Sequence, residues 1–288
     1  MSHAGILPVP NRQMPASHVL VGTGRADIPP IPNLGARGDA ITVFAGPCSV
    51  ESAEQFEEVA ECVAGLGLHW IRGGAFKPRT NPHSFQGLGE EALKIMKAVG
   101  DKYDLLTLTE VMDSAHCEMV HSYVDGLQVG ARNFQNFSLL EKIGQVTALS
   151  RKMVLYKRGF AGTIAEWLAA CDYITAKGND NVVLCERGIR TFETATRFTL
   201  DIAAVPVIHK QSLFPVCVDV SHPAGQRDLV PSLAYAAVAA GADSLMIEVH
   251  PNPPKALSDG PQQLTLAQFE DLVAELRKIA AVFGKAIA

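Results

Sequence analysis

The feature that most constrains the fold is a rhythm that starts at residue 41, where short apolar runs alternate with longer stretches of helical spacing. The runs are ITVFAG (41–46), LHWIRG (68–73), DLLTLTE (104–110), GLQVG (126–130), MVLYK (153–157), VVLCER (182–187), PVCVDVSH (215–222) and SLMIEVH (244–250). The helical patterns cover 52–66, 89–100, 113–122, 137–147, 162–178, 192–204, 227–241 and 265–284. Strands that are apolar on both faces and alternate with helices are typical of a parallel sheet covered by helices. Because eight such units close into a (β/α)8 barrel, we predict a TIM barrel over residues 41–288.

The main alternative is an open, doubly wound sheet. That fold predicts a GxGxxG turn after the first strand, whereas this chain has Gly46-Pro47-Cys48-Ser49 there. A length of 288 residues is compatible with one barrel domain. Residues 1–40 are rich in Pro and Gly, and they are too short for a separate domain with its own core. We expect them to form an extension with a short strand or hairpin at most, and no regulatory domain.

Charge and hydropathy exclude several classes of partner. The net charge is −5, so no overall field attracts nucleic acid or an anionic membrane. No apolar run approaches the length needed to span a bilayer. The six cysteines lack CxxC pairing, which favours a reducing, cytoplasmic environment over a disulfide framework.

A barrel places its functional groups at the C-terminal ends of the strands. Cys48, His222 and Glu248 stand at the ends of the first, seventh and eighth predicted strands, which become neighbours when the barrel closes. Asp259 lies in the loop after the eighth. A thiolate, an imidazole and two carboxylates suit a borderline divalent metal such as Zn, Mn, Fe or Co. His250 follows closely and stays unassigned as a ligand, an outer-layer group or a buried histidine.

A second group at the strand ends is cationic. Its members lie at or just beyond predicted strands 2, 4, 5 and 6: Arg72, Lys77, Arg79, Arg132, Lys157 and Arg187. Arginine binds phosphate and carboxylate bidentately, and lysine acts as a point charge. Six cations suit ligands with several negative charges, phosphates above all. The alternative is that each pairs with a local carboxylate, such as Glu186 beside Arg187.

Glu110 ends the third predicted strand in TLTEVMD. A carboxylate that faces cations can hold a water molecule or accept a proton. It can equally serve as an ion-pair partner that orients an arginine, and both roles stay open from the sequence.

These residues lie within motifs that resemble one enzyme family over about residues 43 to 271. The motifs are GPCSVES (46–52), GGAFKPRTNPHSFQGLG (73–89), TEVMD (109–113), QVGARNFQN (128–136), YKRGF (156–160), CERGIRTFE (185–193), DVSH (219–222) and EVHPNPPKALSDGPQ (248–262). The chain is similar to the 3-deoxy-D-arabino-heptulosonate 7-phosphate synthases, in the short type I beta subclass related to 3-deoxy-D-manno-octulosonate 8-phosphate synthase. The resemblance implies a condensation of phosphoenolpyruvate with D-erythrose 4-phosphate, the first step of the shikimate pathway.

The resemblance also implies roles for individual residues. The divalent metal would be held by Cys48, His222, Glu248 and Asp259. Phosphoenolpyruvate would contact Lys77, Arg132, Lys157 and Arg187, with Arg72 at the reacting centre. Erythrose 4-phosphate would contact Arg79 and Thr80, and Glu110 would lie near the attacking water. The residues expected to take part directly in catalysis are Arg72, Lys77, Glu110, Lys157 and His222.

Two other functions compete with this one. The octulosonate synthase uses arabinose 5-phosphate, but it has a KANRSS-like run where this chain has Lys-Pro-Arg-Thr at 77–80. A barrel that has lost catalysis and serves as a binding partner predicts a missing ligand or rim cation, and none is missing. Relatives of this kind are commonly oligomers, so we also expect a homodimer or homotetramer.

Overall fold

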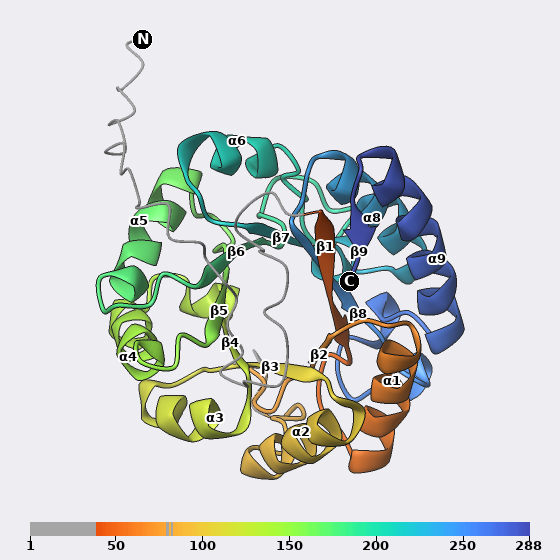
Figure 1. Ribbon diagram of the computed structural model, residues 1–288, viewed down its shortest axis with the longest axis horizontal. Coiled ribbons are helices and arrows are strands. Elements are labelled where there is room, and N and C mark those ends of the chain that lie inside the picture. Colours follow the sequence, from red (N-terminus) through yellow and green to blue (C-terminus); the bar gives the residue numbers. More distant parts are fainter. Residues whose placement is uncertain (1–38, 79–80, 82) are drawn as a thin grey trace.

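The computed structural model describes residues 39–78, 81 and 83–288. Its centre is a closed ring of parallel strands (Figure 1): β1 Ala40–Gly46, β2 Trp70–Arg72, β3 Leu106–Glu110, β4 Gly126–Val129, β5 Met153–Lys157, β6 Val182–Glu186, β7 Val216–Asp219 and β8 Ser244–Glu248. Each strand pairs with the next along the chain, and β8 pairs with β1 to close the ring. The predicted (β/α)8 barrel is therefore confirmed.

Helices form an outer layer around this ring in Figure 1. They are α1 Ala53–Gly65, α2 Glu90–Tyr103, α3 Cys117–Tyr123, α4 Phe137–Thr147, α5 Ile164–Thr175, α6 Ala204–Gln211, α7 Ser221–Ala224, α8 Val230–Ala239 and α9 Leu266–Val282. Single 3₁₀ turns lie at η1 Ser114–His116, η2 Ala131–Asn133, η3 Arg227–Leu229, η4 Pro253–Lys255 and η5 Gly260–Gln262. Side chains at Ser52, Thr163 and Thr265 accept backbone N–H groups at the first turns of α1, α5 and α9, which fixes where these helices begin.

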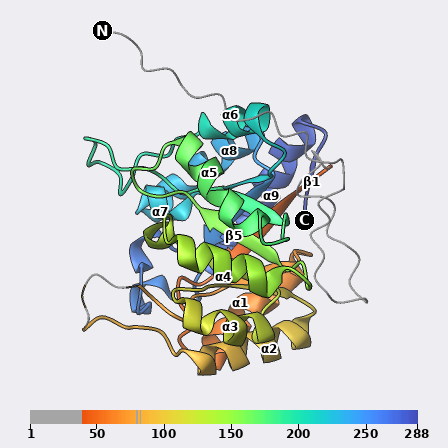
Figure 2. The same ribbon diagram turned by 90° about the vertical axis from the view of Figure 1, so that its left-hand side faces the viewer.

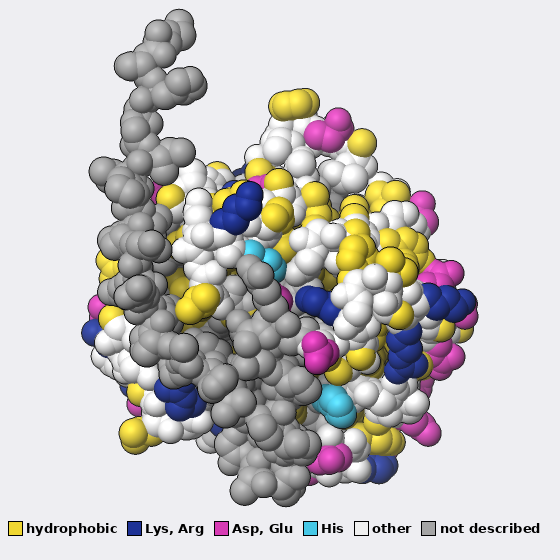
Figure 3. Space-filling model, turned by 45° about the horizontal axis from the view of Figure 1, so that its top comes forward, with side chains coloured by type: hydrophobic (Ala, Val, Ile, Leu, Met, Phe, Trp, Pro, Cys, Tyr) yellow, Lys and Arg dark blue, Asp and Glu magenta, His cyan; other side chains and the backbone are white. Residues whose placement is uncertain are grey.

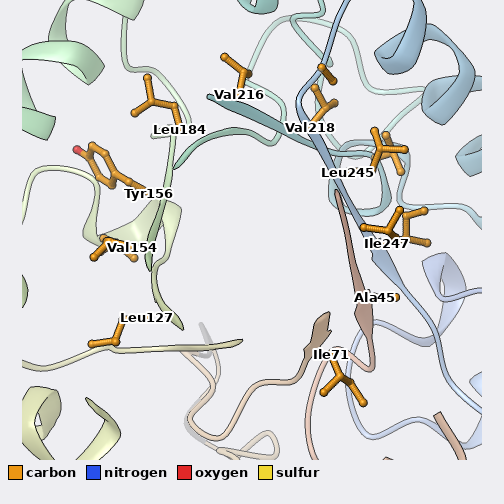
Figure 4. Packing of buried hydrophobic residues seen from close by; sticks show 14 of the residues in the cluster. Ala45, Ile71, Leu127, Val154, Tyr156, Leu184, Val216, Val218, Leu245 and Ile247 are labelled. Atoms are coloured by element: carbon orange, nitrogen blue, oxygen red, sulfur yellow. The ribbon is translucent and has the colours of Figure 1, made fainter. Parts of the chain in front are cut away.

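The alternating side chains of the strands build two apolar layers. One set points outward from the ring toward the helices, as Ala45, Tyr156 and Ile247 do in Figure 4. The other set fills the interior of the barrel and includes Phe44, Trp70 and Met246. Burial on both faces explains why the strands read as continuous apolar runs in the sequence.

The two ends of the barrel are built differently. At the N-terminal end of the strands, β9 (Ala286–Ile287) pairs in parallel with the start of β1. Figure 2 shows this C-terminal segment on one side of the molecule, while α7 and the long loops lie on the other. Functional groups at the C-terminal ends of the strands are therefore carried by loops that stand on a rigid frame.

One predicted helix is wrong. The sequence predicts a helix over 192–204, but the chain there is a long loop, and α6 begins only at Ala204. Within this loop Ile189 and Thr199 form an antiparallel bridge. The β-branched threonines at 191, 194, 196 and 199 lower the helix propensity of this segment, and Asp201 is held by an ion pair to Arg158. The seventh strand is also shorter than predicted, so His222 lies in α7 rather than at a strand end.

The predicted extension falls mostly on residues 1–38, which lie outside the described residues, as do Arg79 and Thr80. In the part of the chain that is described, no helix is long and apolar enough to cross a membrane. The face drawn in Figure 3 carries its visible Lys and Arg side chains at separate places, with Asp and Glu among them. This scatter agrees with the small net negative charge.

Candidate active site

Six of the predicted site residues line one cavity of about 290 Å³ at the C-terminal end of the barrel: Lys77, Glu110, Arg132, Arg187, His222 and Asp259. The cavity is lined by Lys77, Pro78, Asn81, Ser84, Glu110, Arg132, Phe160, Arg187, Arg197, Phe198, His222 and Asp259. A larger cavity, of about 620 Å³, lies beside it between the loops after β4 and β5, and shares Arg132 and Phe160. The carboxylate that lines this larger cavity, Glu166, caps α5. We therefore assign the chemistry to the smaller cavity, where acids, cations and a histidine converge.

The four predicted metal-binding side chains come together. Ligand atoms of Cys48, Glu248 and Asp259 all lie within 4.8 Å of one another. His222 Nε2 lies 3.6 Å from Glu248 Oε1 and 3.9 Å from Asp259 Oδ2. Donors bound at about 2.0–2.3 Å to one ion must lie roughly 3–4 Å apart. Cys48, Glu248 and Asp259 therefore form a donor group of the right chemistry for a divalent cation, and His222 lies beside Glu248 and Asp259 but outside that group.

Asp219 was not predicted as a site residue, but it contacts His222, one of the predicted donors. Its Oδ2 lies 2.7 Å from His222 Nδ1 and also 2.7 Å from Lys157 Nζ. Its Oδ1 accepts the backbone N–H groups of Ser221 and His222. Burial alone would raise the pKa of Asp219, but His222 and Lys157 hold it well below its usual range. A carboxylate on the far nitrogen of a histidine fixes the ring so that Nε2 faces the metal.

Cys48 is completely buried, and its surroundings bear directly on the metal site. Burial, followed by the nearby Glu248 carboxylate, raises the pKa of the Cys48 thiol to about 11. The Lys77 ammonium donates to the Cys48 carbonyl oxygen at 2.9 Å and lies 3.0 Å from the sulfur. A thiol in this setting stays protonated at neutral pH, so a metal that binds it must displace the proton.

Two of the predicted rim cations are paired with carboxylates of the site itself. Arg72 Nη1 lies 3.2 Å from Glu248 Oε1 and donates to the Pro47 carbonyl oxygen at 2.7 Å. Lys157 pairs with Asp219 across the barrel, as described above. The alternative prediction, that rim cations pair with local carboxylates, therefore holds for Arg72 and Lys157.

Arg187 and Arg132 behave differently. Among the described residues, neither has a carboxylate within salt-bridge distance. Arg187 is only 4% exposed, and its guanidinium lies over the rings of Phe160 and Phe198. The expected partner Glu186 instead contacts Arg158 at 2.9 Å, and Arg158 also contacts Asp201 at 2.7 Å. The charges of these two arginines are therefore not neutralised by any carboxylate in the part of the chain that the structure describes.

Glu110 lines the same cavity. Its Oε2 accepts a hydrogen bond from Gln128 at 3.1 Å. Its Oε1 is buried, and no residue in the described ranges satisfies it. A side chain at Gly130 would collide with this carboxylate, because a Cβ there would lie 2.0 Å from Oε1. A buried oxygen without a protein partner suits a bound water or a substrate hydroxyl.

Arg197 is a second cavity residue that the sequence did not reveal. Its Nη1 lies 3.0 Å from Asp259 Oδ2 and donates to Gln262 at 2.8 Å. Arg197 belongs to segment 192–204, which was predicted to be a helix, so its side chain was not expected at the site. His250, by contrast, turns away from the cavity: its Nδ1 accepts the Asn252 N–H, and its Nε2 lies 3.4 Å from Glu51.

A closed (β/α)8 barrel with a mixed sulfur, nitrogen and oxygen donor set beside unpaired arginines defines a class of barrel enzymes that act on anionic substrates. Residues 32–282 match the model of the DAHP synthetase I family. The chain belongs to this family, and it is an enzyme of the transferase type.

Individual relatives agree with this assignment. A phospho-2-dehydro-3-deoxyheptonate aldolase from Thermotoga maritima is 51% identical over 243 residues, which are 84% of this chain and 71% of that protein. A crystal structure of DAHP synthase from Thermotoga maritima matches with a TM-score of 0.83 and 49% identity, covering 87% of this chain and 72% of that one. A truncated form from the same organism matches with a TM-score of 0.80 and 46% identity, covering 87% and 90%.

More distant relatives carry a different name. A 2-dehydro-3-deoxyphosphooctonate aldolase from Caulobacter vibrioides is 32% identical over 266 residues, which are 85% of this chain and 89% of that protein. The two related activities are therefore both represented among the similar proteins, and the heptonate enzyme is much the more similar of those described here.

Proposed function

We propose that this protein condenses phosphoenolpyruvate with D-erythrose 4-phosphate to give 3-deoxy-D-arabino-heptulosonate 7-phosphate and phosphate. This is the entry step of the shikimate pathway to aromatic compounds. The observation that carries the proposal is one cavity in which unpaired arginines face a metal-type donor set. Family membership supports the same reaction. We further propose that residues 41–288 form the catalytic domain, since every site residue described above lies within them.

Cys48, His222, Glu248 and Asp259 would hold one divalent ion, with Mn, Zn, Fe and Co as the candidates. When bound, such an ion supplies Lewis acidity that polarises the aldehyde carbonyl. His222 is suited to this role because burial lowers its pKa, which keeps the ring neutral and free to bind a metal.

The cations of the chain bind and orient phosphoenolpyruvate. We assign its phosphate and carboxylate to Arg132, Arg187, Lys77 and Lys157. Burial lowers the pKa of Lys157, but the adjacent Asp219 more than offsets this, so the amine stays an ammonium. Arg72 keeps a buried Nε–H without a partner among the described residues, and we assign this group to the reacting centre. Fixed charges of this kind offset the repulsion between two anionic substrates.

The bond changes follow from these positions. The C2=C3 π electrons of phosphoenolpyruvate form a bond from C3 to the aldehyde carbon, the carbonyl π bond breaks, its oxygen takes a proton to become a hydroxyl, and positive charge develops at C2. Glu110, with its unpartnered Oε1, holds the water that adds to C2 and accepts its proton. The resulting hemiketal phosphate loses phosphate by cleavage of the bond between C2 and the phosphate oxygen, while the new C2 hydroxyl gives up its proton and becomes the ketone. We assign the phosphate of erythrose 4-phosphate to Arg79 and Thr80, which lie outside the described residues.

The octulosonate synthase reaction is the second candidate, because relatives with that name are about one-third identical to this chain. A direct test mixes the protein and a divalent metal with phosphoenolpyruvate and either erythrose 4-phosphate or arabinose 5-phosphate. Loss of the enol absorbance reports turnover. We expect turnover with erythrose 4-phosphate. Turnover with arabinose 5-phosphate alone would overturn the proposal, and no turnover with either would favour a catalytically inactive barrel. Light scattering would test the proposed dimer or tetramer.

A further inference from the structure

Two phenylalanines form a small aromatic platform at the edge of the cavity. Phe160 comes from the loop after β5 and Phe198 from the loop after β6, and their rings stack with centroids 5.2 Å apart and planes 10° apart. The guanidinium of Arg187 lies 4.9 Å from the Phe160 centroid and 4.1 Å from the Phe198 centroid. Arg132 lies 5.8 Å from the Phe160 centroid. Arg190, 5.0 Å from the Phe160 centroid, and the paired Arg197, 5.8 Å from the Phe198 centroid, lie at the edges of the same rings. The two unpaired arginines of the cavity therefore share one aromatic support, with Arg187 in the nearest contact.

Backbone hydrogen bonds and one glycine hold the two phenylalanines of this platform in place. The Phe198 N–H donates to the Pro223 carbonyl oxygen at 3.1 Å, and the Phe160 carbonyl oxygen accepts the Arg190 N–H at 2.7 Å. Gly188 has a positive φ of 89° and leaves room for Phe198, because a Cβ at this position would lie 2.7 Å from the Phe198 Cβ. The stack thus joins two loops that are far apart in the sequence.

The aromatic platform explains how Arg187 can stay charged in a buried position. This side chain is buried, and burial lowers its pKa, so its charge is costly to keep without a partner. A carboxylate partner would relieve the cost, as Glu186 does for Arg158. It would also neutralise the cation and compete with any anionic ligand. An aromatic face attracts a guanidinium through its quadrupole and leaves the net charge unchanged.

We propose that the Phe160–Phe198 stack positions Arg187 and Arg132 for the phosphate and carboxylate of phosphoenolpyruvate while leaving their charge available. The phenylalanines are positioning residues, since they act through the arginines. This inference rests on the proposed function, because it takes phosphoenolpyruvate as the ligand of the two arginines.

The test compares ring removal with ring retention. Phe160→Leu and Phe198→Leu keep an apolar side chain but remove the aromatic face, whereas Phe160→Tyr and Phe198→Tyr keep it. Phe137→Leu is the matched control, because Phe137 also stacks on an aromatic ring, that of Tyr173, but takes no part in the cavity. The dissociation constant of phosphoenolpyruvate is measured by calorimetry without any aldehyde. Binding of Co²⁺ is followed in parallel through the thiolate charge-transfer band.

We expect each leucine variant to raise the dissociation constant about 2- to 30-fold, the range of one cation–π contact. The tyrosine variants and Phe137→Leu should bind like the wild type, and the Co²⁺ band should be unchanged throughout. Leucine variants that bind phosphoenolpyruvate like the wild type would overturn the inference. Tyrosine variants whose affinity for phosphoenolpyruvate falls as much as that of the leucine variants would overturn it as well. If the wild-type protein itself fails to bind phosphoenolpyruvate, the proposed function fails and the inference falls with it.

Discussion

Two sides of the site hold their cations in opposite ways. One side, the metal-type wall, presents His222 and Asp259 to the cavity, and its cations lie outside the cavity lining, where Arg72 pairs with Glu248 and Lys157 pairs with Asp219 in contacts of 3.2 and 2.7 Å. On the facing wall, Arg187 and Arg132 lie over aromatic rings and have no carboxylate partner among the described residues. The first arrangement fixes geometry, and the second leaves positive charge for a ligand.

Arg158 sharpens this contrast, because it is as buried as Arg187 and follows the adjacent strand. Arg158 contacts two carboxylates, those of Glu186 and Asp201. It thereby ties the loop after β6 to the loop after β5. Two arginines of equal burial at the same end of the barrel thus serve different purposes. Removing a paired, buried cation leaves a carboxylate uncompensated, whereas in the proposed function the unpaired Arg187 is assigned to the substrate.

The largest expected effect comes from breaking the metal-type wall. A chelator, or the Cys48→Ala variant, should lower turnover by about three orders of magnitude, since Lewis-acid stabilisation contributes several kcal/mol. Added Mn²⁺, Zn²⁺ or Co²⁺ should restore the chelated wild type but not Cys48→Ala. Turnover that survives both treatments would refute the metal assignment.

Replacing the carboxylate behind His222 should have the next largest effect. Asp219→Asn should weaken Co²⁺ affinity about 10- to 100-fold, because the histidine loses the group that orients it. Asp243→Asn is the matched control: Asp243 contacts His209 at 2.8 Å and accepts the Val216 N–H at the other end of the barrel. Equal losses of Co²⁺ affinity in both variants would show that Asp219 has no specific role.

The smallest effect is expected at Arg197, which bridges the two walls through Asp259. Its side chain is 37% exposed, and ion pairs of this kind contribute about 1 kcal/mol at most. Arg197→Gln should therefore change kcat/KM by no more than about fivefold. Arg151→Gln, which breaks the exposed pair with Asp180, serves as the control and should leave kcat/KM unchanged. A hundredfold loss at Arg197 would instead indicate direct contact with a substrate.

The sequence predicted the frame because it depends on local patterns, and it placed the expected donors near one another for the same reason. Apolar runs mark the strands, and polar residues at or just beyond their ends, such as Glu248 and Cys48, lie at the mouth of the barrel. It did not predict Asp219 as the link between Lys157 and His222, because that contact crosses from β5 to β7. Arg197 was missed because a threonine-rich, irregular loop was taken for a helix.

The aromatic platform was equally beyond local patterns. Phe160 and Phe198 are 38 positions apart in the sequence, and they meet only because β5 and β6 are neighbours in the ring. Whether an arginine is paired or unpaired is likewise a tertiary property. Glu186 stands next to Arg187 in the chain, yet its carboxylate contacts Arg158. Adjacent side chains on a strand point to opposite faces, which explains why sequence neighbours did not pair.

The contrast between paired and unpaired arginines can be tested in one equilibrium unfolding experiment on Arg158→Met and Arg187→Met, with and without phosphoenolpyruvate. Arg158→Met should lower the free energy of unfolding by about 3–5 kcal/mol in both conditions, because it leaves the Glu186 carboxylate buried and unpaired. Arg187→Met should be close to the wild type in stability without ligand, because the buried charge that it removes has no carboxylate partner among the described residues.

The ligand should then separate the variants. At a hundred times the wild-type dissociation constant, phosphoenolpyruvate should stabilise the wild type by about 2.7 kcal/mol. Arg187→Met loses charged hydrogen bonds to phosphoenolpyruvate, so it should bind this ligand at least about tenfold more weakly. The stabilisation of the variant by phosphoenolpyruvate should therefore fall to about 1.4 kcal/mol or less. Arg187→Met that is destabilised as much as Arg158→Met, yet keeps the full stabilisation by phosphoenolpyruvate, would contradict the assignment of unpaired arginines to the substrate.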